Sequence, residues 1–325
     1  MSATIKASLA FFILAANTIS AGLVCAQTYP SRPIRLVAAF SAGSTSDILA
    51  RIIGPKLHES WRQPVVVENR PAAGGVVAGE IVARATPDGQ TLLISSSGFS
   101  ASAALYTRLP YDSVKDFSGV AQIASGSTVL VAAPATGAKS VKELIALAKS
   151  KPGQLQYGSA GIGSGAHYVG ELFRLAAGIT VTHVPYKGAP EYLNDIAAGR
   201  LPFAFSPIPS TLSFINSGRV IALAVAPKTR SHLLPNVPTV AEAGLTDFAY
   251  DGWYGIFVAS ATPRRIVHQL SNEIGRIIAL PEVNNFILKQ GETPLWSAPE
   301  AFDKMVHADI ATRRKVFSAA GVKPE

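Results

Sequence analysis

The chain has 325 residues, of which 48% are hydrophobic and 15% are charged, so it can bury a sizeable core and is not a disordered chain. The formal net charge is +8, yet the basic residues are scattered. The densest basic cluster, Arg313–Lys315, falls on a predicted amphipathic C-terminal helix and is interpreted as a solvated face. Because no basic stripe alternates with aromatic residues, no nucleic-acid partner is expected.

The N-terminus is predicted to be a signal peptide over residues 1–26. Lys6 supplies a positive charge, and the apolar run Leu9–Ala16 is shorter than the roughly 20 residues that span a bilayer. Val24–Ala26 offers the small residues that a signal peptidase reads, so cleavage is expected before Gln27. The mature protein is therefore expected to be exported, and the family resemblance described below implies the periplasm.

Cys25 is the only cysteine of the chain. An alternative interpretation is a lipoprotein signal in which Cys25 carries the lipid, although Val24 before it fits that pattern poorly. Cleavage after Ala26 removes the cysteine, so the exported chain is expected to have no disulfide, no thiol nucleophile and no cysteine metal site.

Short apolar strands alternate with helices along most of the chain, and this alternation predicts an α/β fold with parallel sheets covered by helices. The first strand is Ile34–Phe40, which a Gly/Ser/Thr loop joins to a helix that begins at Asp47. Further on, Ser140 and Glu143 form a capping box. Further strands and helices are predicted at residues 65–68, 76–85, 92–94, 129–133 and 141–149.

A second unit of the same kind lies in the middle of the chain, with a strand at Leu155–Gly158, a Gly/Ser loop and a helix at Ala166–Phe173. The chain is expected to cross between two lobes at residues 124–130 and 249–255. Later elements are predicted at residues 179–184, 189–198, 203–205, 213–217, 220–226, 255–260, 264–280 and 299–320. Lobe 1 is then expected to comprise residues 27–125 and 252–325, and lobe 2 residues 126–251.

Two Gly/Ser loops are the main functional signal, and we call them loop 1 (Phe40–Asp47) and loop 2 (Ser159–His167). Small residues let backbone N–H groups approach a ligand closely, and a helix N-terminus favours an anion. Two such loops therefore predict two lobes that close on one small anionic molecule. Ser96, Ser97 and Ser206 are added as candidates because they follow strands. The candidate ligand-binding residues are Phe40, Ser41, Ala42, Gly43, Ser44, Asp47, Ser96, Ser97, Ser159, Gly163, Ser164, Gly165, Ala166, His167 and Ser206.

Catalytic and cofactor-binding alternatives fit the motifs less well. Gly161–Ala166 matches the dinucleotide pattern G-x-G-x-x-A, but no acid ends the following strand to hold a ribose. Ser159 and Ser164 lack the flanking glycines of a nucleophile elbow, although a Ser–His pair formed by the fold stays open. No metal and no cofactor are expected, because His167 and His183 stand apart in the sequence.

Several candidate residues also have plain structural interpretations. His167 is interpreted mainly as a hydrogen-bonded structural residue, and Asp47 mainly as a helix cap. Aromatic residues beside apolar runs are by default assigned to the core. These are Phe40, Tyr168, Trp253 and Tyr254.

Motifs along almost the whole chain resemble those of the Bug-type receptors, the periplasmic substrate-binding proteins of tripartite tricarboxylate transporters. The matching segments are Tyr29–Val37, Pro64–Pro71, Leu109–Asp112 with Lys115–Phe117, Lys139–Ile145, Thr182–Gly188 and Pro235–Gly244. The resemblance implies a two-lobe periplasmic binding protein, or Venus flytrap, with the ligand in a cleft. It also implies that loops 1 and 2 hold a ligand carboxylate through backbone groups, small side chains and water.

The chain departs from the family pattern at a few positions. Loop 1 has Ala39, Ala42 and Ser44 in places where relatives usually carry prolines and a double glycine. Ser206 stands where relatives often have Asp or Asn, which argues against an amino-acid ligand and favours a plain carboxylate, including an aromatic acid.

These observations together predict a monomeric, non-catalytic receptor for a small carboxylate, either a di- or tricarboxylate or an aromatic acid. Its expected partners are that ligand and the membrane permease subunits of a tripartite tricarboxylate-type transporter. Two alternatives stay open at this point, an exported serine hydrolase that uses Ser159 or Ser164 on a carboxylate ester, and a ligand-sensing subunit of a signalling partner.

Overall fold

The computed structural model describes residues 29–322, and the account below concerns the compact unit that begins at Arg32. The predicted signal peptide and Cys25 lie outside the described residues. Among the described helices, none is both long and apolar enough to cross a bilayer.

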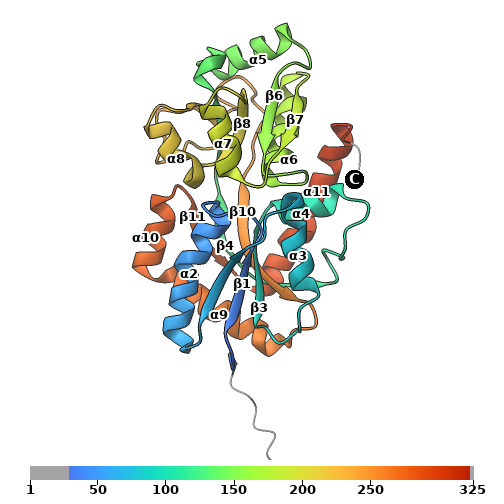
Figure 1. Cartoon of the computed structure of the whole chain (residues 1–325), viewed down its shortest axis with the longest axis vertical. Coiled ribbons are helices and arrows are strands. Elements are labelled where there is room, and N and C mark those ends of the chain that lie inside the picture. Colours follow the sequence, from blue (N-terminus) through green and yellow to red (C-terminus); the bar gives the residue numbers. More distant parts are fainter. Residues whose placement is uncertain (1–28, 323–325) are drawn as a thin grey trace, which may run out of the picture. The chain divides into compact units, whose positions relative to one another are not determined.

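Two separate β-sheets organise this unit, and each defines a lobe (Figure 1). The sheet of lobe 1 has the strand order β11-β4-β10-β3-β1-β2, and the sheet of lobe 2 has the order β7-β6-β8-β5-β9. The lobe 1 strands are β1 (Ile34–Ala38), β2 (Val65–Asn69), β3 (Thr91–Ser96), β4 (Phe117–Gly126), β10 (Gly252–Ala259) and β11 (Thr293–Ser297). The lobe 2 strands are β5 (Thr128–Ala132), β6 (Gln156–Ser159), β7 (Thr182–Pro185), β8 (Phe203–Pro207) and β9 (Ile221–Val225).

The prediction of parallel sheets holds only for part of each sheet, because both sheets are mixed. Strand β1 pairs in parallel with β2 and β3, and β6 with β7 and β8, as βαβ connections require. Strands β10 and β5, however, run antiparallel to their neighbours. Each of these strands enters its sheet directly from the other lobe rather than through a helix, which permits the reversed direction.

Helices cover both sheets, and several of them had no sequence prediction. Helices α4 and α10 and strand β11 were missed, and strand β4 was anticipated only where it overlaps the crossing segment 124–130. Helix α8 begins at Ile208 rather than at Ser213. The lobe 1 helices are α2 (Thr45–Trp61), α3 (Val76–Ala83), α4 (Gly98–Leu105), α9 (Arg264–Ala279), α10 (Pro281–Lys289) and α11 (Pro299–Ala319), with the short 3-10 turn η1 (Ala73–Gly75). The lobe 2 helices are α5 (Val141–Ser150), α6 (Gly165–Ala177), α7 (Ala189–Ala197) and α8 (Ile208–Asn216), with the 3-10 turn η2 (Pro134–Thr136).

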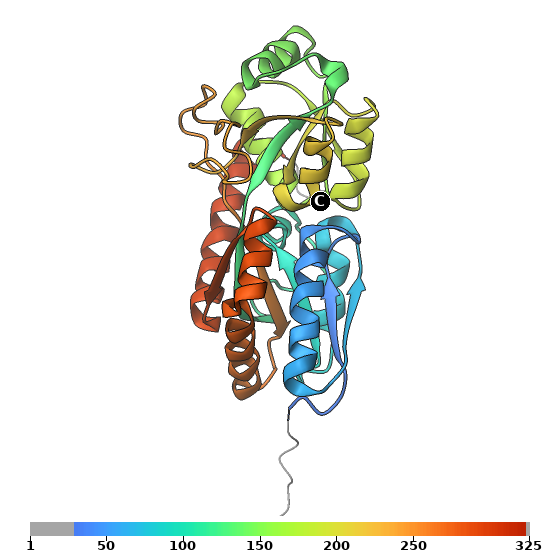
Figure 2. The ribbon, with the colours of Figure 1, turned by 90° about the vertical axis from the view of Figure 1, so that its left-hand side faces the viewer.

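The long C-terminal helix α11 packs against both lobes, as Figure 2 shows for the red helix beside both sheets. Phe302 and Ile310 belong to the lobe 1 core with Phe99 and Phe257, whereas Phe317 belongs to the lobe 2 core. The helix therefore contributes one apolar stripe to two cores.

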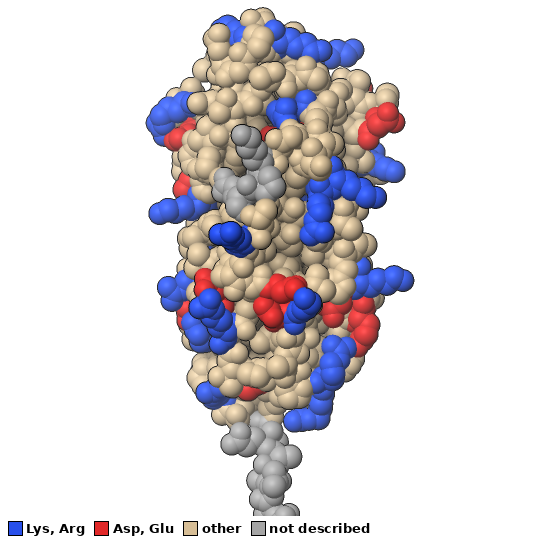
Figure 3. Space-filling view, turned by 90° about the vertical axis from the view of Figure 1, so that its right-hand side faces the viewer, with Lys and Arg blue, Asp and Glu red and all other residues tan. Residues whose placement is uncertain are grey.

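The interpretation of Arg313 as part of a solvated face was wrong, because its side chain is only 2% exposed. Its position explains this, since Val306, Ile310, Arg313 and Phe317 follow helical spacing and lie on the buried face of α11. Arg314 is exposed, in agreement with the prediction. On the face shown in Figure 3, Lys and Arg side chains stand in separate groups, several of them beside acidic side chains.

Candidate functional site

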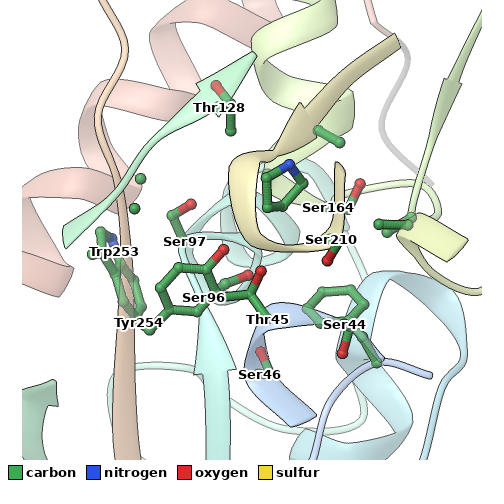
Figure 4. A pocket seen from close by; sticks show the side chains of 18 of the residues that line it. Ser44, Thr45, Ser46, Ser96, Ser97, Thr128, Ser164, Ser210, Trp253 and Tyr254 are labelled. Atoms are coloured by element: carbon green, nitrogen blue, oxygen red, sulfur yellow. The ribbon is translucent and has the colours of Figure 1, made fainter. Parts of the chain in front are cut away.

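A cavity lies between the two lobes, beside the segments 124–130 and 249–255 that link their sheets (Figure 4). Its wall includes residues of loop 1, loop 2 and both linking segments. The lining residues are Phe40, Ser44, Thr45, Ser46, Ser96, Ser97, Gly126, Thr128, Ala160, Ser164, Gly165, Ala166, Ala189, Tyr192, Pro207, Ser210, Tyr250, Gly252, Trp253 and Tyr254.

Loop 1 is shaped by the N-terminal cap of α2. Ser44 is the N-cap, and its Oγ accepts the backbone N–H of Asp47 at 3.5 Å. The Asp47 carboxylate in turn accepts the N–H of Gly43 at 3.0 Å, and Gly43 has a φ of +78° that suits glycine. These reciprocal bonds hold the loop against the start of the helix.

Loop 2 repeats this arrangement at the start of α6. Ser164 is the N-cap, and its Oγ accepts the backbone N–H of His167 at 3.2 Å. The Nδ1 atom of His167 accepts the N–H of Gly163, also at 3.2 Å, and Gly163 has a φ of +72°. Loops 1 and 2 therefore share one backbone design although their N3 residues differ.

In both helices the first two backbone N–H groups have no hydrogen-bond partner within the described part of the chain. The amides of Thr45 and Ser46 in α2, and of Gly165 and Ala166 in α6, have no hydrogen-bond partner among residues 29–322. All four residues line the cavity. Helices α4, α7 and α8 also begin at its wall, where Ser97, Ala189 and Pro207 lie, so five positive helix ends meet there.

The wall of the cavity carries no charged side chain, since its described lining residues include no Asp, Glu, Lys, Arg or His. Hydroxyl groups and backbone amides supply its polar atoms. The electrostatic field inside therefore comes from helix ends and from charges that lie behind the wall. Such a field favours an anion without placing a fixed counter-ion beside it.

Aromatic side chains make up much of the wall. Trp253 and Tyr254 from β10 face the cavity together with Thr45 and Ser97 (Figure 4). The Tyr250 hydroxyl lies 2.7 Å from Ser97 Oγ. The prediction that Trp253 and Tyr254 belong to the core is confirmed by their burial, and both side chains also line the cavity.

Eight of the predicted ligand-binding residues do not line the cavity. Asp47, His167, Gly43 and Gly163 build the caps described above, and Ser206 accepts a hydrogen bond from Tyr192 at 3.0 Å. The other seven predicted residues line the cavity, and the eight that do not are Ser41, Ala42, Gly43, Asp47, Ser159, Gly163, His167 and Ser206.

Loop 2 rests on a pair of stacked histidines. The rings of His167 and His183 lie 4.0 Å apart at an interplanar angle of 17°. Burial lowers the pKa of His167 to about 4. Burial, together with the neighbouring His167, lowers the pKa of His183 to about 3. Both imidazoles are therefore neutral at physiological pH, which leaves Nδ1 of His167 free to accept the Gly163 N–H.

A Ser–His pair does form, because Ser159 Oγ lies 2.6 Å from His183 Nε2. Ser159 is fully buried, does not line the cavity, and also accepts the Gly161 N–H at 3.1 Å. The pair therefore supports the loop and has no access to a substrate. Ser164 is occupied as a helix cap.

The lobes touch along a seam on either side of loop 2. A Cβ atom added to Gly74, whose φ is +65°, would lie 2.2 Å from the backbone oxygen of Ile162. Ser102 Oγ donates a hydrogen bond to the Gly163 carbonyl at 3.2 Å. At loop 1, Ser41 Oγ donates to the Glu191 carboxylate at 3.1 Å. Ser41 thus joins the lobes instead of facing the cavity.

Sequence reasoning missed much of the wall that comes from the linking segments. Six missed wall residues lie within the predicted crossing points at 124–130 and 249–255, and these are Gly126, Thr128, Tyr250, Gly252, Trp253 and Tyr254. These residues could have been predicted to line the cavity, because segments that cross between lobes border the cleft between them. The remaining missed residues are Thr45, Ser46, Ala160, Ala189, Tyr192, Pro207 and Ser210.

Comparison with known proteins agrees with this geometry. The family model "Tripartite tricarboxylate transporter family receptor" matches residues 49–322. The chain is 36% identical over 310 residues to a UPF0065 protein of the tcbD-tcbE intergenic region of Pseudomonas sp. strain P51, covering 95% of this chain and 92% of the relative. It is 33% identical over 302 residues to protein BugT of Bordetella pertussis, covering 92% of this chain and 93% of BugT.

Solved structures show the same relationship. Rpa4515 of R. palustris with adipate superposes with a TM-score of 0.88 at 32% identity, covering 91% of this chain and all of that chain. MatC of Rhodopseudomonas palustris with bound malate gives a TM-score of 0.85 at 29% identity, covering 89% of this chain and 99% of that chain. The chain therefore belongs to the tripartite tricarboxylate transporter receptor family and is a two-lobed, non-enzymatic solute receptor of the Bug type.

Proposed function

We propose that this receptor binds a small carboxylate in the interlobe cavity and delivers it to the permease of a tripartite tricarboxylate-type transporter. The observation that carries the proposal is the set of four unpartnered amides of α2 and α6, which open on an uncharged cavity from both lobes. A hydrogen bond to a charged group contributes roughly 1.5–3 kcal/mol, so a carboxylate bound to both helix ends favours the closed form.

The candidate ligand-binding residues divide into two roles under this proposal. Those on the wall contact the carboxylate or the body of the ligand. Those behind it, above all Asp47 and His167, fix the loops that present the amides. Adipate in Rpa4515 and malate in MatC support a carboxylate as the ligand class.

The body of the ligand is proposed to be a plain carboxylic acid, with aromatic acids included. Ser206 is engaged with Tyr192 and Thr211, at 3.0 and 2.7 Å, and offers no acceptor to a ligand amine. The aromatic wall of Phe40, Tyr250 and Trp253 suits an apolar or flat body.

Closure is proposed to use the crossing segments 124–130 and 249–255 as hinges. The lobes are then residues 27–125 with 252–325, and residues 126–251. Residues 1–26 are proposed to direct the chain to the periplasm, where the receptor acts as a monomer.

A thermal-shift screen tests the proposal, with acetate, benzoate, adipate, malate, citrate and aspartate as ligands. A ligand that binds only the native state raises its melting temperature by mass action, by about 5 °C at a hundredfold excess over Kd. A shift with one or more of the carboxylates that lack an amine is expected. If no acid in the panel shifts the melting temperature, the carboxylate assignment fails.

A further inference from the structure

The largest fully buried side chain of the described chain is a cation, Arg313 of α11. It lies outside the cavity wall but directly behind it. Its guanidinium carbon is 4.2 Å from the ring centre of Tyr168 and 5.4 Å from that of Tyr250. Tyr250 lines the cavity, so a single aromatic ring separates the charge from the ligand space.

The charge of Arg313 is incompletely balanced. Its Nε donates to Asp309 Oδ2 at 2.8 Å, but its buried Nη1 has no hydrogen-bond partner among residues 29–322. Asp309 is 19% exposed, so water screens its carboxylate. The same Oδ2 atom also accepts the indole N–H of Trp253 at 2.8 Å. A buried cation with one shared, hydrated partner keeps part of its field.

That field is directed at the loop 2 end of the cavity. Tyr250 bonds to Ser97, and a Cβ atom added to Gly165 would lie 3.0 Å from Ser97 Oγ and 3.1 Å from the Tyr250 hydroxyl. A row of neighbouring groups therefore leads from the Arg313 guanidinium through the Tyr250 ring and the Ser97–Tyr250 hydroxyl pair to the α6 amides.

We propose that Arg313 is a positioning residue that gives the cavity its preference for an anion over an uncharged analogue. It acts without contact, by holding the Tyr250 and Trp253 walls and adding positive potential at the α6 amides. The inference rests on the proposed carboxylate-binding function, and it explains how a cavity with no charged wall residue can select a charged ligand.

The test compares acids with their uncharged amides in calorimetric titrations of the full receptor. The probes are acetate, benzoate and adipate, paired with acetamide, benzamide and adipamide. The variants are Arg313→Met, which keeps much of the volume and removes the charge, and Arg313→Lys, which keeps the charge. Arg314→Met is the matched control, because it removes the same charge from the exposed face of the same helix.

Arg313→Met is expected to weaken acid binding by about tenfold, the effect of one unit charge acting through protein, while amide binding changes little. Arg313→Lys is expected to recover most of the acid-over-amide ratio, and Arg314→Met to leave it unchanged. Equal weakening of acids and amides in Arg313→Met and Arg313→Lys would show a merely structural role and overturn the proposal.

A second variant covers the case in which Arg313→Met does not fold. Asp309→Asn keeps an acceptor for Trp253 and Arg313 but removes the counter-charge, so it is expected to strengthen acid binding by a few fold. Unchanged or weaker acid binding in Asp309→Asn contradicts the inference. If no acid of the thermal-shift panel binds the unaltered receptor, it is the proposed function itself that fails.

Discussion

Loops 1 and 2 have the same backbone arrangement, but a different side chain stabilises each of them. Each has an N-cap serine, a glycine of positive φ before it, and an N3 side chain that accepts the N–H of that glycine. In loop 1 the acceptor is the Asp47 carboxylate, and in loop 2 it is the neutral imidazole of His167. The shared element is the backbone that presents two amides, and the acceptor differs with its surroundings.

The surroundings explain the choice of acceptor. Burial raises the pKa of Asp47, but hydrogen bonds from Arg51, Gly43 and Asn69 outweigh this and leave the pKa below its usual value. Arg51, half exposed, thus balances the negative charge of loop 1. His167 instead packs against the rings of His183 and Phe317, and burial keeps its imidazole neutral. A neutral acceptor avoids burying an unpaired charge near the anion site.

Blocking loop 2 is expected to have the largest effect. In Gly165→Leu the new side chain meets Ser97 and Tyr250 and fills the space before the α6 amides. Overpacking of up to about 3 kcal/mol predicts a loss of affinity of about 100-fold or more in titration calorimetry. Thr45→Leu makes the equivalent change at loop 1. If Gly165→Leu binds acids normally while Thr45→Leu does not, only loop 1 contacts the ligand.

The second-largest expected effect is a loss of stability at low pH, which involves loop 2 through His167. The pKa of His167 is lowered to about 4, so between pH 6.5 and 4 the unfolded chain binds a proton that the native state does not. Native stability is therefore lost as the pH falls, by roughly 2.5 kcal/mol for this group at pH 4.5. His167→Asn, which keeps a neutral acceptor, should make the unfolding free energy depend less steeply on pH, and the dependence that remains is due to groups such as His183 and Asp47, whose pKa values are also lowered. An unchanged slope would mean that His167 is protonated as in the unfolded chain.

Removal of the caps is expected to have a moderate effect. Ser164→Ala and Ser44→Ala should each lower the unfolding free energy by about 1 kcal/mol, and both should weaken acid binding. Ser140→Ala is the matched control, since Ser140 caps α5 in the same way at 3.2 Å, away from the cavity. It should lower stability but leave affinity unaltered. Weaker binding in all three variants would indicate a general loss of stability instead.

The smallest expected effect on acid affinity comes from removing Arg51, the cation that pairs with Asp47 in loop 1. Arg51→Gln leaves Asp47 without its cation, so acid affinity should fall by about two- to threefold, and less in high salt. Arg84→Gln breaks a comparable exposed pair with Glu80 and should not change affinity. An effect of Arg51→Gln that persists at 1 M salt would rule out this electrostatic explanation.

The helix starts that shape loops 1 and 2 were predictable from the sequence because their signals are local. Gly43, Ser44, Gly163 and Ser164 have conformations that follow from small residues beside a helix start. The mixed direction of β5 and β10 was not predictable in this way, because it depends on which lobe a strand enters from. Arg313 was misassigned because its charge was weighed above its spacing from Ile310 and Phe317.

The wall contributed by Tyr192 and Ser210 shows a further limit. Their place at the cavity is set by how the lobes meet, to which no short pattern in α7 or α8 points. Strand β11 and helix α10 were missed for a related reason. The strand is short and pairs only with β4, so long-range contacts rather than local periodicity define it.

The contact of Gly74 with Ile162 has a consequence for selectivity. Backbone meets backbone there, so no flexible side chain is available to absorb a mismatch between the lobes. An occupant that is slightly too bulky would separate these two peptide segments before it disturbed its own surroundings. Under the proposed function, the size of a ligand is then expected to be limited at a contact that the ligand does not itself make.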